Sequence, residues 1–111
     1  MENQYTEVSR ERDKEPNHYL VVKKGYDTKN MSGFMLSKTG TWIQSDYPSS
    51  KNPSRHVEYF STLDDAIEKR NISPKHRDIV AFYYWTIRFS TNGTGINGFS
   101  TDSEEVLVNV D

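Results

Sequence analysis

Apolar residues are concentrated in one stretch of the chain, residues 79–89, with the sequence IVAFYYWTIRF. Nine of its eleven residues are apolar, and five aromatic side chains fall within eight positions. Its β-branched and aromatic content and its alternation predict a strand. The alternative is a helix, capped by Ser73, with Pro74 at its first position and Asn92-Gly93 as its stop.

As a strand, this stretch has two faces, and we expect the one centred on Tyr83, Trp85 and Ile87 to be core. The opposite face is the candidate contact surface for a partner, because few helices are expected to cover both faces of the sheet. Aromatic residues and arginine are also enriched at protein interfaces. The predicted partner-binding residues are Phe82, Tyr84 and Arg88.

Shorter apolar runs, separated by turn residues, predict further strands. They lie at residues 19–22, 34–37, 41–44, 56–60 and 105–110, with a hairpin loop at 38–40 and a long loop at 46–55.

A helix is predicted over Leu63–Arg70. The hydroxyl of Ser61 or Thr62 can cap it, and Asp64 and Asp65 complement the dipole in its first turn. Apolar residues recur at helical spacing, and Asn71 is expected to end the helix in a left-handed conformation.

The ends of the chain are polar and acidic. Residues 1–17 carry charges at close intervals and few apolar side chains, so we expect a flexible N-terminal arm followed by one domain over residues 18–111. The sequence therefore predicts an α+β fold, in which an antiparallel sheet of five to six strands packs with one main helix.

Composition excludes several functions. Without cysteine there are no disulfides, thiolate metal sites or cysteine nucleophiles. The N-terminus lacks an apolar signal-peptide core, and no run of 18 apolar residues occurs, so a cytoplasmic protein without membrane spans is expected.

No motif identifies a chemistry. Residues 93–98, GTGING, match a dinucleotide-binding pattern, but neither the helix nor the acidic residue that this site requires follows them. The acids at the helix start are explained by its dipole, and the three histidines show no metal-ligand spacing. We predict no catalytic site, cofactor or metal.

Basic residues gather at two places. The first set is a candidate anion-binding patch: Lys69, Arg70, Lys75, His76 and Arg77. Lys51, Arg55 and His56 lie in and beside the long loop. Such a patch would suit nucleic acid. The sequence pI of about 5.9 is, however, far below the domain pI of about 9 or more that is typical of nucleic-acid-binding domains.

The order of a strand (residues 19–25), a hairpin (33–42) and YFSTLDDAI entering a helix (59–67) resembles small accessory proteins of bacteriophages. The leading hypothesis is a non-enzymatic module that acts by protein–protein interaction, either with itself as a homodimer or as an inhibitor or modulator of a host protein. A nucleic-acid or anion binder is the alternative. A small hydrolytic enzyme is the third, since Ser, His and Asp side chains need not be adjacent in sequence.

Overall fold

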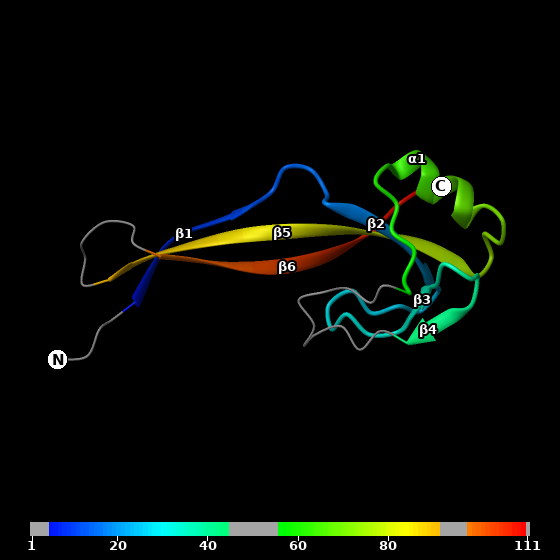
Figure 1. Ribbon diagram of the computed structural model, residues 1–111, viewed down its shortest axis with the longest axis horizontal. Coiled ribbons are helices and arrows are strands. Elements are labelled where there is room, and N and C mark those ends of the chain that lie inside the picture. Colours follow the sequence, from blue (N-terminus) through cyan, green and yellow to red (C-terminus); the bar gives the residue numbers. More distant parts are fainter. Residues whose placement is uncertain (1–4, 45–55, 92–97, 111) are drawn as a thin grey trace.

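One long strand, β5 (Arg77–Thr91), forms the axis of the computed structural model, which describes residues 5–44, 56–91 and 98–110. Strands β1 (Tyr5–Arg12) and β2 (His18–Lys23) follow one another along one side of β5, and β6 (Gly98–Val108) lies along the other. Strands β3 (Phe34–Leu36) and β4 (Trp42–Gln44) extend the sheet beyond β2. All pairings are antiparallel (Figure 1).

The predicted fold class is confirmed: the described residues form a six-stranded antiparallel sheet with one helix. The aromatic stretch at residues 79–89 is a strand, as its alternation predicted, and it extends beyond the predicted bounds at both ends. No helix in the described part of the chain is long and apolar enough to cross a membrane.

The main core lies on the Phe82 side of the sheet, so the prediction that the Tyr83 side would be core is right only in part, for its buried residues Ile79, Ala81 and Ile87. Leu20, Val22, Val80 and Phe82 pack there with Met35 and Val57. Segments distant in sequence supply this cover, including the partly buried Tyr26 and Tyr59. Near Phe82 and Tyr84, the face that the sequence suggested for a partner is therefore the one that the chain itself buries.

The opposite side of the sheet is covered by the helix at one end, and Ile87, farther along β5, is also only 6% exposed there. Val21, Ile79 and Ala81 are at most 2% exposed, and α1 (Leu63–Arg70) contacts β2 and β5 on the side away from β4 (Figure 1). Both faces of β5 are thus covered over residues 79–82. Farther along β5, the helix no longer covers the Tyr83 face.

Helix α1 begins as predicted. The Thr62 hydroxyl accepts the Asp65 N–H at 3.2 Å, and Asp64 and Asp65 occupy the first turn. Its end differs from the prediction, because Asn71 keeps a right-handed conformation (φ −71°, ψ −10°) and donates its N–H to the Ile67 carbonyl. A left-handed residue is not required, since the chain continues through a further turn, with the Ser73 N–H bonded to the Arg70 carbonyl.

Three local predictions are corrected. The arm predicted over residues 1–17 contains β1, which pairs along β5 although it buries little apolar surface. Strand β6 begins at Gly98 rather than at residue 105. The strand predicted at residues 56–60 makes only isolated bridges, between Ser37 and Val57 and between Tyr19 and Phe60. Residues 93–97 of the glycine-rich segment and the whole of the predicted long loop, residues 46–55, lie outside the described residues.

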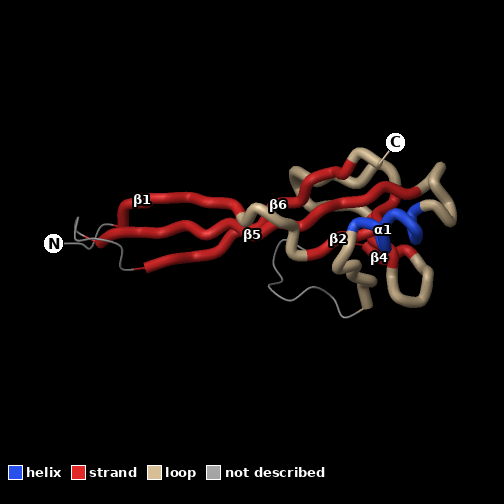
Figure 2. The backbone as a smooth tube through the Cα atoms, turned by 90° about the horizontal axis from the view of Figure 1, so that it is seen from above, coloured by secondary structure: helices blue, strands red, loops and turns tan. Residues whose placement is uncertain are grey.

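The molecule is elongated, with extents of 57 × 24 × 21 Å and a radius of gyration of 17.0 Å. A compact chain of this length would have a radius of gyration of about 13 Å. The excess comes from β1, β5 and β6, which project away from the end that carries α1, β3 and β4 (Figure 2). We call this projection the ribbon and define it as β1, residues 83–91 of β5 and residues 98–104 of β6.

Candidate docking surface on the ribbon

The ribbon is a three-stranded antiparallel sheet in which β5 lies between β1 and β6. Trp85 stands opposite Arg12 of β1 on one side and Asp102 of β6 on the other. Farther along, Ile87 likewise stands between Arg10 of β1 and Ser100 of β6. One bulge, at Val8, shifts the register between β1 and β5, whereas β5 and β6 stay in register over their whole pairing. The central strand is therefore fully paired, and the outer sides of β1 and β6 are the edges.

The face of the ribbon that carries Trp85 is covered by its own polar side chains. The Trp85 indole N–H donates to Glu104 Oε2 at 2.9 Å, and the Arg12 guanidinium lies 3.3 Å from the same oxygen. Arg12 also lies 4.2 Å from the centroid of the Tyr83 ring, within reach of a cation–π contact. Arginine from β1 thus extends across the central strand toward the acids of β6.

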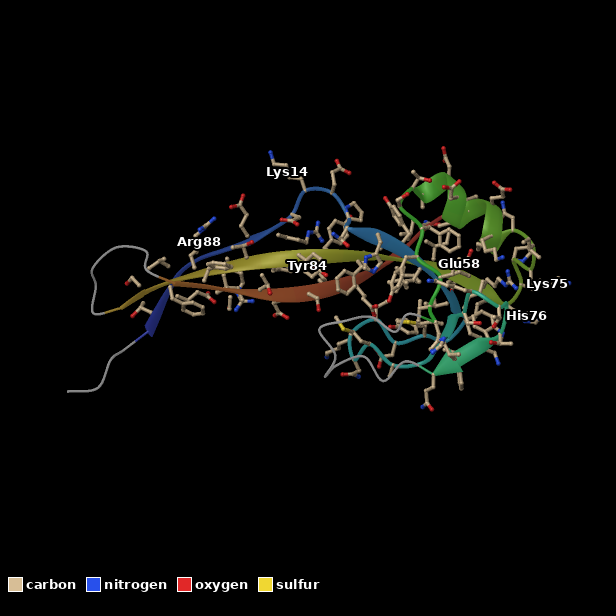
Figure 3. All side chains as sticks on the ribbon, viewed as in Figure 1. Lys14, Glu58, Lys75, His76, Tyr84 and Arg88 are labelled. Atoms are coloured by element: carbon tan, nitrogen blue, oxygen red, sulfur yellow. The ribbon has the colours of Figure 1, made fainter. Side chains whose placement is uncertain are left out.

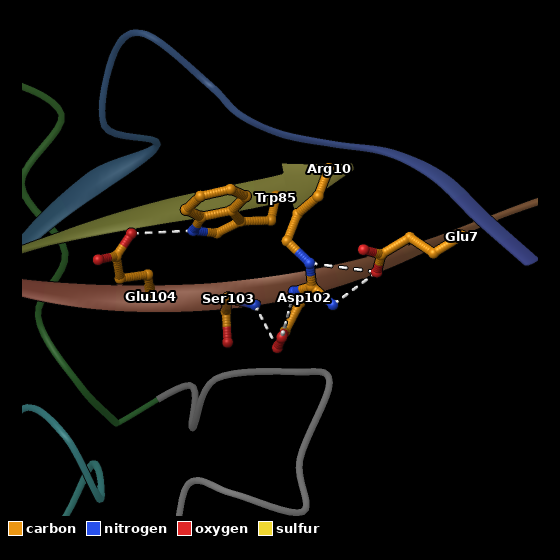
Figure 4. A network of polar contacts seen from close by, with 6 residues as sticks. All are labelled: Glu7, Arg10, Trp85, Asp102, Ser103 and Glu104. Atoms are coloured by element: carbon orange, nitrogen blue, oxygen red, sulfur yellow. Dashed lines mark hydrogen bonds and ion pairs between the residues drawn. The ribbon is translucent and has the colours of Figure 1, made fainter. Parts of the chain in front are cut away.

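Arg10 makes a similar connection farther along the ribbon (Figure 4). Its guanidinium lies 2.8 Å from Glu7 and 3.9 Å from Asp102, and Ile87 on this face is only 6% exposed. These ion pairs are exposed, so each contributes at most about 1 kcal/mol. Their main effect is that the aromatic row on this face is shielded and its polar groups are partnered.

The opposite face contains the three predicted partner-binding residues, and the structure separates them. Phe82 is 4% exposed and lies between the His18 and Tyr84 rings. Tyr84 is partly buried against the core, whereas Arg88 is exposed on the ribbon (Figure 3). Only Arg88 is freely available to a partner.

Sequence reasoning missed Phe99, which stands directly opposite Arg88 on β6. Its side chain is 71% exposed, the most exposed large apolar residue in the described part of the chain. The neighbouring residues are polar, so no apolar alternation indicated a strand at that position. An aromatic residue within a polar run was the one available signal.

The backbone of β6 directs alternate peptide groups away from the ribbon. The carbonyl oxygens of Phe82 and Tyr84 accept N–H groups from Asn17 and Asp13, so these two residues turn their polar groups away from β6. Because the N–H and C=O of one strand residue point to the same side, Ser103, opposite Tyr84, directs its own outward. By the same alternation Phe99 and Thr101 also direct theirs outward.

The two edges of the ribbon differ in their protection against pairing. Strand β1 has the bulge at Val8 and a charged residue at half of its positions, which are common devices on edge strands. Strand β6 has no bulge, lysine or proline, and no described strand pairs with its outer side. Glu105, at 5% exposure, closes this side toward the core. We call the outer side of β6 over residues 98–104 the open edge.

Two titratable side chains flank Phe82 within the core. Burial lowers the pKa of His18 to about 4, and its Nδ1 lies 2.8 Å from Asn17 Oδ1. Burial raises the pKa of Glu105, and the hydrogen bond from the Tyr26 hydroxyl, at 2.5 Å, offsets part of that rise. In the strand register, His18 of β2 and Glu105 of β6 both stand directly opposite Phe82, one on each side of β5. Both side chains belong to the packed core, so we assign them no role in binding a substrate.

The predicted anion-binding residues do not form a free basic patch. Arg70 is 8% exposed and donates from Nε to the Arg77 carbonyl at 3.4 Å. Arg77 donates from Nη1 to the Lys69 carbonyl at 2.9 Å, and Lys69 Nζ lies 3.7 Å from Glu58. Lys75 and His76 are exposed (Figure 3). The two arginines thus fasten the end of α1 to β5.

The second basic set cannot be placed as a group. Lys51 and Arg55 lie outside the described residues, and His56 is exposed. Within the described ranges, no cluster of three or more His, Asp or Glu side chains could hold a metal ion.

Comparisons with protein-family models, with curated proteins and with solved structures give no match for this chain.

Proposed function

We propose that this chain is a non-enzymatic binding module that acts by protein–protein interaction, with the open edge of β6 as its docking surface. One observation carries the proposal: no described strand pairs with the outer side of β6 over residues 98–104, a stretch that includes Phe99, whose side chain is 71% exposed. Unpaired backbone groups beside an apolar side chain are the features that recognise an extended segment of another protein.

Strand addition explains how such a surface would bind. The outward N–H and C=O groups of Phe99, Thr101 and Ser103 would pair with an incoming strand, and backbone pairing of this kind provides affinity with little dependence on sequence. Covering the Phe99 side chain would add about 1.5–3 kcal/mol. Arg88 stands beside Phe99 and supplies a charge that can select the partner.

Charge on the ribbon does not favour nucleic acid. The ribbon contains three basic and four acidic side chains. A phosphate backbone would meet net repulsion there, and the arginines at the end of α1 already hold backbone carbonyls. We therefore expect no salt-sensitive binding of DNA or RNA by this module.

Affinity capture from the native host with the immobilised full-length chain tests the proposal. Phe99→Lys should reduce capture of any specific partner by about tenfold or more, because lysine on an edge strand opposes strand addition. Ile72→Lys is the matched control, since Ile72 is 68% exposed and lies outside the ribbon. Equal capture by wild type and Phe99→Lys would refute the proposal.

A further inference from the structure

We propose that the strand added to the open edge is β6 of a second copy of this chain, paired antiparallel about a two-fold axis through Thr101. This inference rests on the proposed function, because it names the partner for that same edge. It predicts a symmetric homodimer in which the two ribbons form one continuous sheet of six strands.

The length of the open edge selects the axis. No described strand pairs with the outer side of residues 98–104, and Glu105 next to them is only 5% exposed, which leaves little room for an added strand at that position. A two-fold axis pairs residues symmetrically, so an interface that uses all seven residues must be centred on Thr101. Thr101 then faces its own equivalent, and Phe99 faces Ser103 of the second copy.

The backbone orientation agrees with this register. Phe99, Thr101 and Ser103 are the residues whose polar backbone groups point outward, and the axis pairs these residues only with one another. Each such pair exchanges two hydrogen bonds, so the interface would hold about six. A register displaced by one residue on one strand would pair outward groups with inward ones.

Side-chain charge also suits this register. On the Trp85 face, Asp102 would stand opposite Ser100 of the second copy, and Glu104 opposite Gly98. Like charges directly opposite each other would destabilise the pair, and none occurs. An axis through Ser103 would instead place Asp102 opposite Glu104 and would require the buried Glu105 at the edge.

On the other face of the sheet, the Phe99 side chain would gain a neighbour from the second copy. Its ring would stand opposite Ser103 of the second copy, a small residue that itself stands opposite Tyr84 across β6 and β5. These three residues lie on the same face of the sheet, so the phenyl ring can extend over the serine toward the partly buried tyrosine ring. Phe99, the most exposed large apolar side chain among the described residues, would thereby gain cover.

The interface is short, so the dimer should be weak. An edge of seven residues buries less than the roughly 1,200 Å² typical of stable complexes, and a dissociation constant on the order of 10 µM to 1 mM follows. Association should therefore depend on concentration over the range accessible to sedimentation.

Cysteine cross-linking tests the register, and the absence of native cysteine makes it clean. Thr101→Cys places two thiols on directly opposed residues, whose Cα atoms would lie about 5.5 Å apart, within the range for a disulfide. Ser103→Cys is the matched control on the same face, because its equivalent would lie about 14 Å away. Under mild oxidation at high protein concentration, Thr101→Cys should form at least about ten times more covalent dimer.

Sedimentation with Phe99→Lys and Ile72→Lys provides the second measurement. We expect Phe99→Lys to be monomeric and Ile72→Lys to dimerise like wild type. Equal cross-linking of the two cysteine variants, or a wild type that stays monomeric near 1 mM, would refute self-pairing. If such a monomer still captures another protein through Phe99, the proposed function survives; if Phe99→Lys leaves that capture unchanged, the proposed function fails separately.

Discussion

His18 stacks on Phe82, with ring centroids 4.6 Å apart and ring planes only 11° from parallel. Both residues are at most 9% exposed. The Tyr84 ring also packs edge-on against the Phe82 ring, with the two ring centroids 5.1 Å apart. Phe82 is therefore the centre of an aromatic group that joins β2 to β5, rather than a contact for a partner.

Replacing Phe82 by alanine should lower the free energy of unfolding by about 3–5 kcal/mol, because the cavity left in a packed core adds to the lost burial. Urea unfolding measures this loss. Phe99→Ala is the control and should change stability by less than about 0.5 kcal/mol, since Phe99 is 71% exposed. Similar losses for the two variants would contradict the assignment of Phe82 to the core.

His18 should make the protein less stable in acid. Its folded-state pKa, lowered to about 4 by burial, lies below the ordinary value of 6.5. Between these values the unfolded chain binds a proton that the folded chain does not, so the free energy of unfolding falls as pH drops from about 6.5 to about 4. The loss should amount to about 1–3 kcal/mol.

His18→Gln tests this prediction, because glutamine keeps an amide donor for Asn17 and does not titrate. Urea unfolding at several pH values should show a shallower decline below pH 6.5 in the variant than in wild type. Parallel pH profiles for the two proteins would show that His18 does not cause the decline.

Glu105 should act in the opposite direction. Its folded-state pKa is raised by burial, so above the unfolded value of 4.5 the unfolded chain releases a proton that the folded chain retains. Stability from this group is complete below pH 4.5 and is lost as pH rises toward the raised pKa. Glu105→Gln removes the titration and keeps an acceptor for the Tyr26 hydroxyl.

The Glu105→Gln variant should therefore have a higher melting temperature than wild type at pH 8 and a smaller difference at pH 4. Thermal unfolding at the two pH values measures this. A variant that is less stable at both would show that the carboxylate, rather than its protonated form, holds Tyr26.

The arginines at the end of α1 should matter for stability rather than for anions. Arg77→Ala removes the hydrogen bond to the Lys69 carbonyl and should cost about 1–2 kcal/mol. Lys75→Ala, an exposed change in the same cluster, should be nearly neutral. If phosphate stabilised wild type but not Lys75→Ala, these residues would form an anion site after all.

The predictable parts of the fold are those whose side chains are packed. Strand β5 was recognisable because its alternation is set by burial on both faces, and α1 because Thr62 and its acids satisfy the first turn locally. Strand β1 was not, because an exposed ribbon strand is held by backbone hydrogen bonds that polar side chains do not reveal. The choice of core face also depended on Tyr26 and Val57, which reach β5 from distant loops.

The candidate site was harder to predict for the same reason. Phe82 and Tyr84 have the composition of an interface, but composition does not distinguish a surface from a core built of aromatic rings. Phe99 became visible as a candidate only when its strand and its exposure were known. An exposed edge is a property of the sheet order, which no local pattern specifies.

Glu104 links all three strands of the ribbon, since Trp85 of β5 and Arg12 of β1 both approach its Oε2. Glu104→Ala should therefore loosen the ribbon while the core around Phe82 stays intact. The substitution should lower the free energy needed to open the ribbon by about 1 kcal/mol, which is the contribution expected of an exposed contact of this kind. Hydrogen exchange should then speed up about fivefold in β1 amides but not in β2 amides, because stability differs between regions of one structure. Glu11→Ala, an exposed acid on β1, is the control; faster exchange throughout β2 as well would show that the ribbon and the core unfold as one unit.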